Sequence, residues 1–292
     1  MPERSQKMAL TINTNISSLV AQRNLANATG SLNKAIERMT TGYKINHAAD
    51  NAAGYSIARN WETQLGSLDV AADNAATGAD MMTTLEDHFA LVTSHLQRVR
   101  DLTEQAANGT YGPDSLNAIK AEITARLDEV DRVAANCEFN GRKLMDGSIT
   151  SDINLQVGLY SGADSQIKLS STLFANSNVA TLFGEDKATV ASKCAGLEDG
   201  TEASSMLNQI DNVIKNISNR TTTLGAAQNR IESAIESIGV QSQNITSSLS
   251  TLRDADIAKE SSSFIQSQIL QQAAATLLAT ANQTPSIALN LL

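Results

Sequence analysis

The side chains best suited to catalysis or metal binding are scarce in this chain. It has three histidines and two cysteines, and His88 and His95 stand seven residues apart, on one helix face but too far apart to chelate one metal ion. A zinc hydrolase would need a His-Glu-x-x-His helix, and an esterase or nucleotide hydrolase would need a Gly-x-Ser-x-Gly turn or a phosphate-binding loop. None of these motifs occurs. We therefore expect no catalytic residue, no metal, no cofactor and no enzymatic activity.

The two cysteines do not form a Cys-x-x-Cys motif, which excludes a zinc ribbon or a dithiol redox site of that type. Cys137 follows Ala134 by one helical step on an apolar stripe, so we expect it to be a small buried residue. Cys194 lies in a segment with no clear periodicity. Whether the two cysteines form a disulfide stays open at this point.

The composition indicates long helices and argues against two classes of partner. Only three prolines interrupt 292 residues, and aromatic residues make up 3%, few for a compact enzyme core. Acidic residues number 31 against 22 basic ones, a net charge of -9 that disfavours nucleic-acid binding. No segment is apolar enough for membrane insertion, and no apolar signal-peptide region opens the chain. Residues 1–7 are polar and unlike the adjoining segment, so we treat them as a leader.

Both ends of the chain are nearly free of charge. No charged residue occurs in 8–22 or in 261–292, yet Ser, Thr, Asn and Gln interrupt the apolar residues throughout. A helix with an apolar stripe and an uncharged polar remainder suits burial among other chains, because a free helix normally turns a charged face to water. A disordered terminus is the alternative, and it is compatible with helix formation on assembly. The apolar residues at helical spacing are Ile12, Ile16, Leu19, Leu32, Ile36 and Met39, and then Ile269, Ala273, Leu277 and Ala281.

The middle of the chain has coiled-coil periodicity. A skip at Met82 and Leu85 interrupts the first seam, which predicts a stammer. The seam residues are Leu65, Leu68, Ala72, Ala75 and Ala79 before the skip, and Phe89, Val92, Leu96 and Val99 after it. A second helix is expected over about 115–137, after a loop at 108–113 that contains Asn-Gly and Gly-Pro. The longest seam runs from 207 to 252, with polar residues that can fix its register at Thr221, Gln228 and Ser242.

Residues 146–200 differ from the helical segments. Alternation in 153–159 and again in 167–169, around a turn at 160–164, predicts a β-hairpin. The rest of this region is expected to be loop with one short helix. The sequence thus predicts a mainly α fold: a long helical coiled-coil bundle with a small β-hairpin insertion and paired N- and C-terminal helices.

The following segments occur in this order along the chain: 8–15 (MALTINTN), 35–46 (AIERMTTGYKIN), 48–54 (AADNAAG), 96–109 (LQRVRDLTEQAANG), 121–133 (AEITARLDEVDRV), 139–141 (FNG), 224–231 (LGAAQNRI), 254–257 (DADI) and 268–283 (QILQQAAATLLATANQ). Together they resemble bacterial flagellin, over roughly 8–147 and 205–292. The match implies a structural subunit that polymerises into the flagellar filament for swimming, in a short form without the outer variable domains. It also implies an inner core domain from 8–50 and 253–292 and an outer core domain from 51–252 with the hairpin region 146–200.

The resemblance also implies partners and a location. Such a chain would leave the cell unfolded through the flagellar type III export channel, meet an export chaperone, the cap and the hook-junction proteins, and reside in the extracellular filament as a homopolymer. Its monomer would be recognised by vertebrate Toll-like receptor 5 through Arg98, Leu102 and Glu122, with Leu102 expected to be exposed beside Arg98, off the seam. The residues expected to mediate polymerisation are Ile12, Ile16, Leu19, Ile269, Leu277 and Leu278.

Two other classes of function compete with this interpretation. The related hook-filament junction protein shares the general architecture, but its match to segments such as AADNAAG, LQRVR and QILQQA is usually poorer. A secreted coiled-coil enzyme or effector is the other alternative, and the missing catalytic motifs disfavour it.

Overall fold

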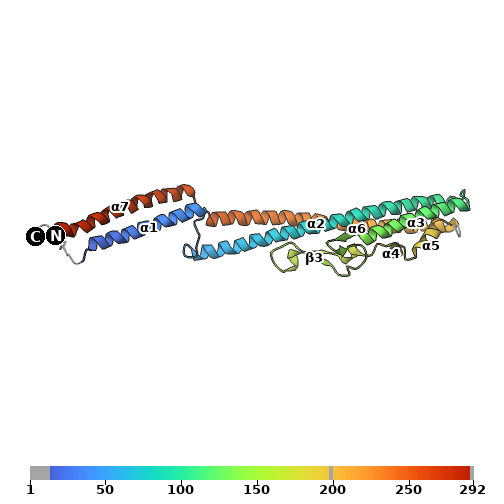
Figure 1. The fold of residues 1–292 in the computed structure, drawn as a ribbon. Coiled ribbons are helices and arrows are strands. Elements are labelled where there is room, and N and C mark those ends of the chain that lie inside the picture. Colours follow the sequence, from blue (N-terminus) through green and yellow to red (C-terminus); the bar gives the residue numbers. More distant parts are fainter. Residues whose placement is uncertain (1–13, 197–199, 290–292) are drawn as a thin grey trace. The chain divides into compact units, whose positions relative to one another are not determined.

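The computed structural model describes residues 14–196 and 200–289, which fold into long helices with two small antiparallel sheets (Figure 1). The mainly α fold with a small β insertion is as the sequence predicts. The helices are α1 Ile16–Thr41, α2 Ala52–Ala106, α3 Pro113–Asn136, α4 Val179–Phe183, α5 Lys187–Cys194, α6 Gly200–Arg253 and α7 Ile257–Leu289. The strands are β1 Glu138–Phe139, β2 Arg142–Lys143, β3 Ile153–Gln156 and β4 Gln166–Leu169, and the 3-10 turns are Ala163–Ser165 and Ser171–Phe174.

The chain divides into two compact units. The terminal unit takes its residues from Met1–Thr63 and Asn244–Leu292, and the central unit is Gln64–Gln243. Helices α2 and α6 contribute residues to both units.

The terminal unit contains the antiparallel pair α1–α7, which confirms that the two ends of the chain pair. Helix α1 begins at the Asn15 cap and ends at Gly42, whose φ of +75° suits a residue without a side chain. Near the start of α1, Asn15 Nδ2 donates to the Ala281 carbonyl over 2.7 Å. Near its end, Arg38 Nη1 lies 3.2 Å from Glu260 Oε1.

Small side chains dominate the contact between α1 and α7. The α1 face that packs against α7 carries buried Ser18, Ala21, Ala28 and Ala35 at spacings of three and seven. On α7, Ser267 and Ala274 are buried. Small residues let two helix backbones approach closely. Larger apolar residues are half-buried in the same pair: Leu25, Leu32 and Met39 of α1 and Phe264 and Leu278 of α7.

The predicted stammer in α2 is wrong. The sequence count chose Ala72 and Ala79, whereas the structure buries Ala71 and Gly78. With these two positions the alternation of three and four is continuous; the count missed it because glycine has no side chain to register as apolar. The buried series is Leu68, Ala71, Ala75, Gly78, Met82, Leu85, Phe89, Val92, Leu96 and Val99.

Helices α3 and α6 complete the core of the central unit. Ile123, Leu127 and Val130 of α3 are fully buried. On α6 the buried series is Ile210, Ile217, Leu224, Ile231 and Ile238. The polar seam residue Gln228 donates from Nε2 to Glu86 Oε2 of α2 over 2.8 Å, a contact that fits the predicted role in register.

The predicted hairpin is confirmed, with Ile153 opposite Leu169 and Gln156 opposite Gln166. It lies against α2, where Asn74 Nδ2 donates to the Gln156 carbonyl over 3.3 Å and where a Cβ added at Gly78 would come within 2.5 Å of Leu155 Cδ1. Glycine at this position therefore leaves room for the hairpin.

The β1–β2 hairpin and one of two short helices were not predicted. Helix α3 ends at Asn136, and Asn140 and Gly141 form a two-residue turn with φ of +49° and +77°. Helix α4 is capped by Asn178 and α5 by Asp186. Region 146–200 is thus more structured than a loop with one helix.

Arg220 of α6 fixes the segment before α4. Its guanidinium lies 4.7 Å from the Phe89 ring centroid and donates to Ser177 Oγ and to the carbonyls of Leu173 and Ala175. Burial without a carboxylate lowers the pKa of Arg220 to about 10. The contacts are those of a structural residue.

Candidate functional site: the outer face of the terminal helix pair

The described part of the chain offers no site for metal chemistry. Within 14–196 and 200–289 no group of three or more His, Cys, Asp or Glu is placed to hold a metal ion. No described helix is both long and apolar enough to cross a membrane. His88 Nδ1 lies 2.7 Å from the Thr84 carbonyl of its own helix.

The terminal pair instead exposes its large apolar side chains. On α1, Ile16 is 66% exposed and Leu19 is 57% exposed. On α7, Ile269 is 59% exposed and Leu277 is 62% exposed. The fully buried side chains of the pair are thus small, and these four large apolar side chains lie on its outer face, where an ordinary monomeric helix would carry polar residues.

Two of the residues expected to mediate polymerisation stand apart from these four. Leu278 is half-buried, three residues before Ala281 on the side of α7 that lies against α1. Ile12 lies outside the described residues.

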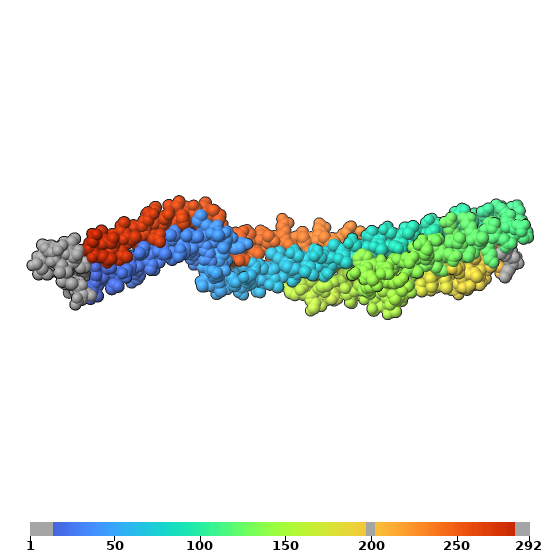
Figure 2. All heavy atoms as spheres, in the orientation of Figure 1, coloured from blue at the N-terminus to red at the C-terminus, as the bar shows by residue number. Residues whose placement is uncertain are grey.

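A groove of three contiguous hollows follows one side of the pair, whose two helices lie side by side in Figure 2. The hollows have volumes of about 450, 590 and 720 Å³. The first two have no charged side chain in their lining, which combines small and uncharged polar residues with a few large apolar ones, Ile16, Val20, Leu270 and Leu277. Charged side chains line the third. Neighbouring hollows share lining residues: Ala21, Asn24 and Leu277 for the first two, and Ser31, Ser263 and Ser267 for the second and third.

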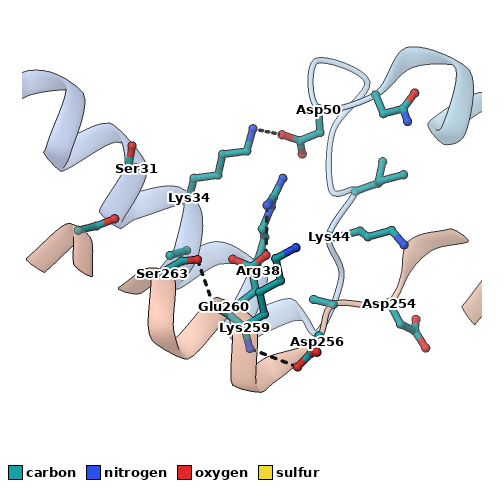
Figure 3. Close-up of a pocket in the computed structure, with 15 residues that line it drawn as sticks. Ser31, Lys34, Arg38, Lys44, Asp50, Asp254, Asp256, Lys259, Glu260 and Ser263 are labelled. Carbon is teal, nitrogen blue, oxygen red and sulfur yellow. Dashed lines mark hydrogen bonds and ion pairs between the residues drawn. The ribbon is translucent and has the colours of Figure 1, made fainter. Parts of the chain in front are cut away.

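The third hollow, here called the polar pocket, is formed by α1, α7 and the connections at 42–51 and 254–256 (Figure 3). Ion pairs on its wall join Lys34 to Asp50 over 2.6 Å and Arg38 to Glu260. The hydrogen bond from Lys34 is the largest cause that lowers the pKa of Asp50 to about 2.

Arg253 holds the two connections together beside this pocket. Its guanidinium lies 4.1 Å from the Tyr43 ring centroid, pairs with Glu62 and donates from Nε to the Ile45 carbonyl over 3.3 Å. The backbone N–H of Lys44 donates to the Arg253 carbonyl over 2.7 Å. Arg253 was not predicted, because it comes directly after a seam position and belongs to no motif of its own.

The three residues matched to the receptor surface do not share one environment. Arg98 of α2 is exposed and lies 2.9 Å from Glu122 of α3, whose carboxylate also lies 3.8 Å from Arg126. Leu102 is only 2% exposed and belongs to the core of the central unit. The expectation that Leu102 is exposed is wrong, because α2 here buries two adjacent positions, Leu102 and Thr103.

Both cysteines are buried and free, which resolves the question left open by the sequence. Burial raises the pKa of the Cys137 and Cys194 thiols to about 11. A protonated, buried thiol is a poor nucleophile, so both cysteines are core residues.

Fold and surfaces together define a class: a helical structural protein whose two ends form one pair with an apolar outer face. The family model of the bacterial flagellin N-terminal helical region matches residues 12–150, and that of the C-terminal helical region matches 207–292. The chain therefore belongs to the bacterial flagellin family. It is a structural protein of the flagellar filament and not an enzyme.

Individual relatives agree over nearly the whole chain. The flagellin of Halalkalibacterium halodurans is 34% identical over 281 residues, covering 96% of this chain and 99% of the relative. The flagellin of Bacillus subtilis is 33% identical over 301 residues, with the same two coverages. A solved structure of a putative flagellar hook-associated protein from Vibrio parahaemolyticus shares the fold, with a TM-score of 0.58 and 15% identity over 70% of this chain and all of that one.

Proposed function

We propose that this chain polymerises through the α1–α7 pair into the flagellar filament used for swimming, with further copies covering the outer face of the pair. The observation that carries the proposal is the apolar outer face of the pair, where Leu19 and Leu277 are more than half exposed while Ala21 and Ala28 are buried. Burying a Leu or Ile side chain contributes about 1.5–3 kcal/mol. Several such residues per subunit, repeated along a helical lattice, would drive assembly.

The proposed division into an inner and an outer core domain follows from the same pair. Residues 8–50 and 253–292 would form the inner core domain, and 51–252 the outer core domain that carries the hairpin. Residues 1–7 would be a leader that belongs to neither domain. The uncharged run 261–292 supports the inner assignment, because a closely packed wall tolerates few unpaired charges.

We infer that the subunit reaches the filament by the flagellar type III export channel, as an unfolded chain. On this route it would meet an export chaperone, the hook-junction proteins and the cap before it joins the extracellular polymer. Family membership supports this route. The two cysteines are free, so no disulfide between them would hinder passage of an unfolded chain through a channel.

Truncation tests the role of the terminal pair. A chain ending at Glu260 should stay a soluble monomer and keep the helix content of the central unit, since residues 64–243 form a unit of their own. Electron microscopy and circular dichroism of the truncated and full chains measure this. Long tubes from the truncated chain would refute the role given to α7.

We further propose that vertebrate Toll-like receptor 5 recognises the monomer at Arg98 and Glu122, with Leu102 supporting α2 from the core. The exposed pair of side chains, 2.9 Å apart across α2 and α3, favours this surface. Arg is a frequent hot-spot residue at interfaces, where truncation costs about 2 kcal/mol or more.

A receptor reporter assay on monomers tests this surface. Arg98→Ala and Glu122→Ala should each weaken signalling by roughly tenfold or more, while Arg142→Ala, also exposed but on β2, should signal as wild type. Leu102→Ala should lower stability by about 2–5 kcal/mol, so its signalling is interpretable only beside a thermal melt. Wild-type signalling by both Arg98→Ala and Glu122→Ala would contradict the proposal.

A further inference from the structure

Arg23 is a charged residue in the middle of the proposed assembly surface. It is the only charged residue between Met8 and Asn33, and it is exposed. It stands seven residues after Ile16 and four after Leu19, on the outward side of α1. In the described part of the chain no carboxylate lies within ion-pair distance of it.

Assembly would turn this exposed arginine into a buried one. If further copies cover Ile16 and Leu19, they cover Arg23 as well, and an unpaired charge taken out of water costs several kcal/mol. The neighbouring stretches 8–22 and 261–292 contain no Asp or Glu side chain that could neutralise it. A counter-charge must therefore come from another part of a neighbouring copy.

The polar pocket holds the carboxylate best placed for this role. Four of the carboxylates in the described terminal unit are already paired: Asp50 with Lys34, Glu260 with Arg38, Glu37 with His47, and Glu62 with Arg59 and Arg253. Asp254 and Asp256 line the pocket, are exposed and have no ion pair in the described chain.

Asp254 is the more available of the two. Asp256 uses Oδ1 to cap α7, accepting from the N–H groups of Ala258 and Lys259. Asp254 accepts one hydrogen bond, from Ser250 Oγ to Oδ2 over 2.6 Å. Asp254 lines the polar pocket, and because this pocket shares Ser31, Ser263 and Ser267 with the next hollow, a neighbouring copy meets one uninterrupted surface.

We propose that Arg23 of one subunit pairs with Asp254 in the polar pocket of a second copy. The inference rests on the proposed polymerisation and deepens it by naming a contact. The proposed pair also sets the axial shift between the two copies. Asp254 forms an isolated β-bridge with Tyr43, just beyond the end of α1 and about 20 residues after Arg23. At 1.5 Å per residue, a parallel copy must therefore be shifted along the helix by roughly 25–30 Å.

A charge swap tests the pair. Arg23→Glu and Asp254→Lys should each raise the critical concentration for filament growth by about tenfold or more, and the double variant should return to within about threefold of wild type. Arg142→Glu, the same substitution on β2, is the matched control. Because both side chains are exposed, monomer melts should be unchanged. If Asp254→Lys melts early, Asp254→Asn removes the charge alone and should still raise the critical concentration, whereas growth of Asp254→Asn as wild type would overturn the pair.

The outcomes separate this inference from the proposed function. Arg23→Glu growing as wild type, or a swap that fails to restore growth, would overturn the Arg23–Asp254 pair. If Leu277→Asp still blocks growth in either case, polymerisation through the terminal pair stands. If Leu277→Asp also grows normally, the proposed function itself fails.

Discussion

For Leu102, the spacing of apolar residues in the sequence did not predict burial. A two-helix seam predicts one buried stripe on α2, and Leu102 lies beside that stripe. In the core of the central unit more than one stripe of α2 is covered, so Leu102 and Thr103 are both buried. The buried Thr103 hydroxyl donates a hydrogen bond to the Val99 carbonyl. The exposure of Arg98, by contrast, followed from its spacing alone.

The two thiols give a residue-scale prediction. Burial raises their pKa values to about 11, so in the folded monomer at mildly alkaline pH both should stay protonated and covered. We expect Ellman's reagent to react slowly with native protein and to titrate two thiols at once in denaturant. Fast reaction of the native monomer, matched by an unchanged melt, would show that Cys137 or Cys194 is not a core residue.

At the scale of elements, Gly78 explains why α2 was miscounted. A search for apolar side chains at heptad spacing does not register a glycine. Gly78 nevertheless occupies a seam position, because Leu155 of β3 fills the space beside it. The long helices and the β3–β4 hairpin were predictable from their periods. The β1–β2 hairpin, α4 and α5 are too short to show a period, although the Asn140–Gly141 turn and the caps Asn178 and Asp186 were visible as local signals.

Two glycines of α2 make a matched test of hairpin docking. Gly66→Ala meets nothing within 4 Å and should stabilise the chain by about 0.5–1 kcal/mol through helix propensity. Gly78→Ala should lose that gain and be at least about 1 kcal/mol less stable than Gly66→Ala, because its methyl displaces Leu155. Denaturant unfolding measures both. In a Leu155→Ala background the difference should vanish, and its persistence there would contradict the proposed cause.

At the scale of the whole molecule, the charge-free ends predicted pairing but not which side chains pair. The sequence stripe through Ile269, Ala273 and Leu277 was expected to be buried among other chains, and in the monomer all three are exposed. The contact within the monomer uses Ala21, Ala28 and their neighbours instead. Sequence periodicity locates an apolar stripe, but it does not distinguish a contact within one chain from a contact between chains.

The central claim is that copies of this chain assemble through the exposed face of the α1–α7 pair. Leu277→Asp tests it most directly, because Leu277 is 62% exposed and the change should leave the monomer melt unaltered. Leu277→Met keeps the volume and serves as the control. Negative-stain electron microscopy of seeded growth should show long filaments from wild type and Leu277→Met, and none from Leu277→Asp at concentrations about tenfold higher. Filaments of normal length and critical concentration from Leu277→Asp would mean that this face stays in contact with water, and the claim would be wrong.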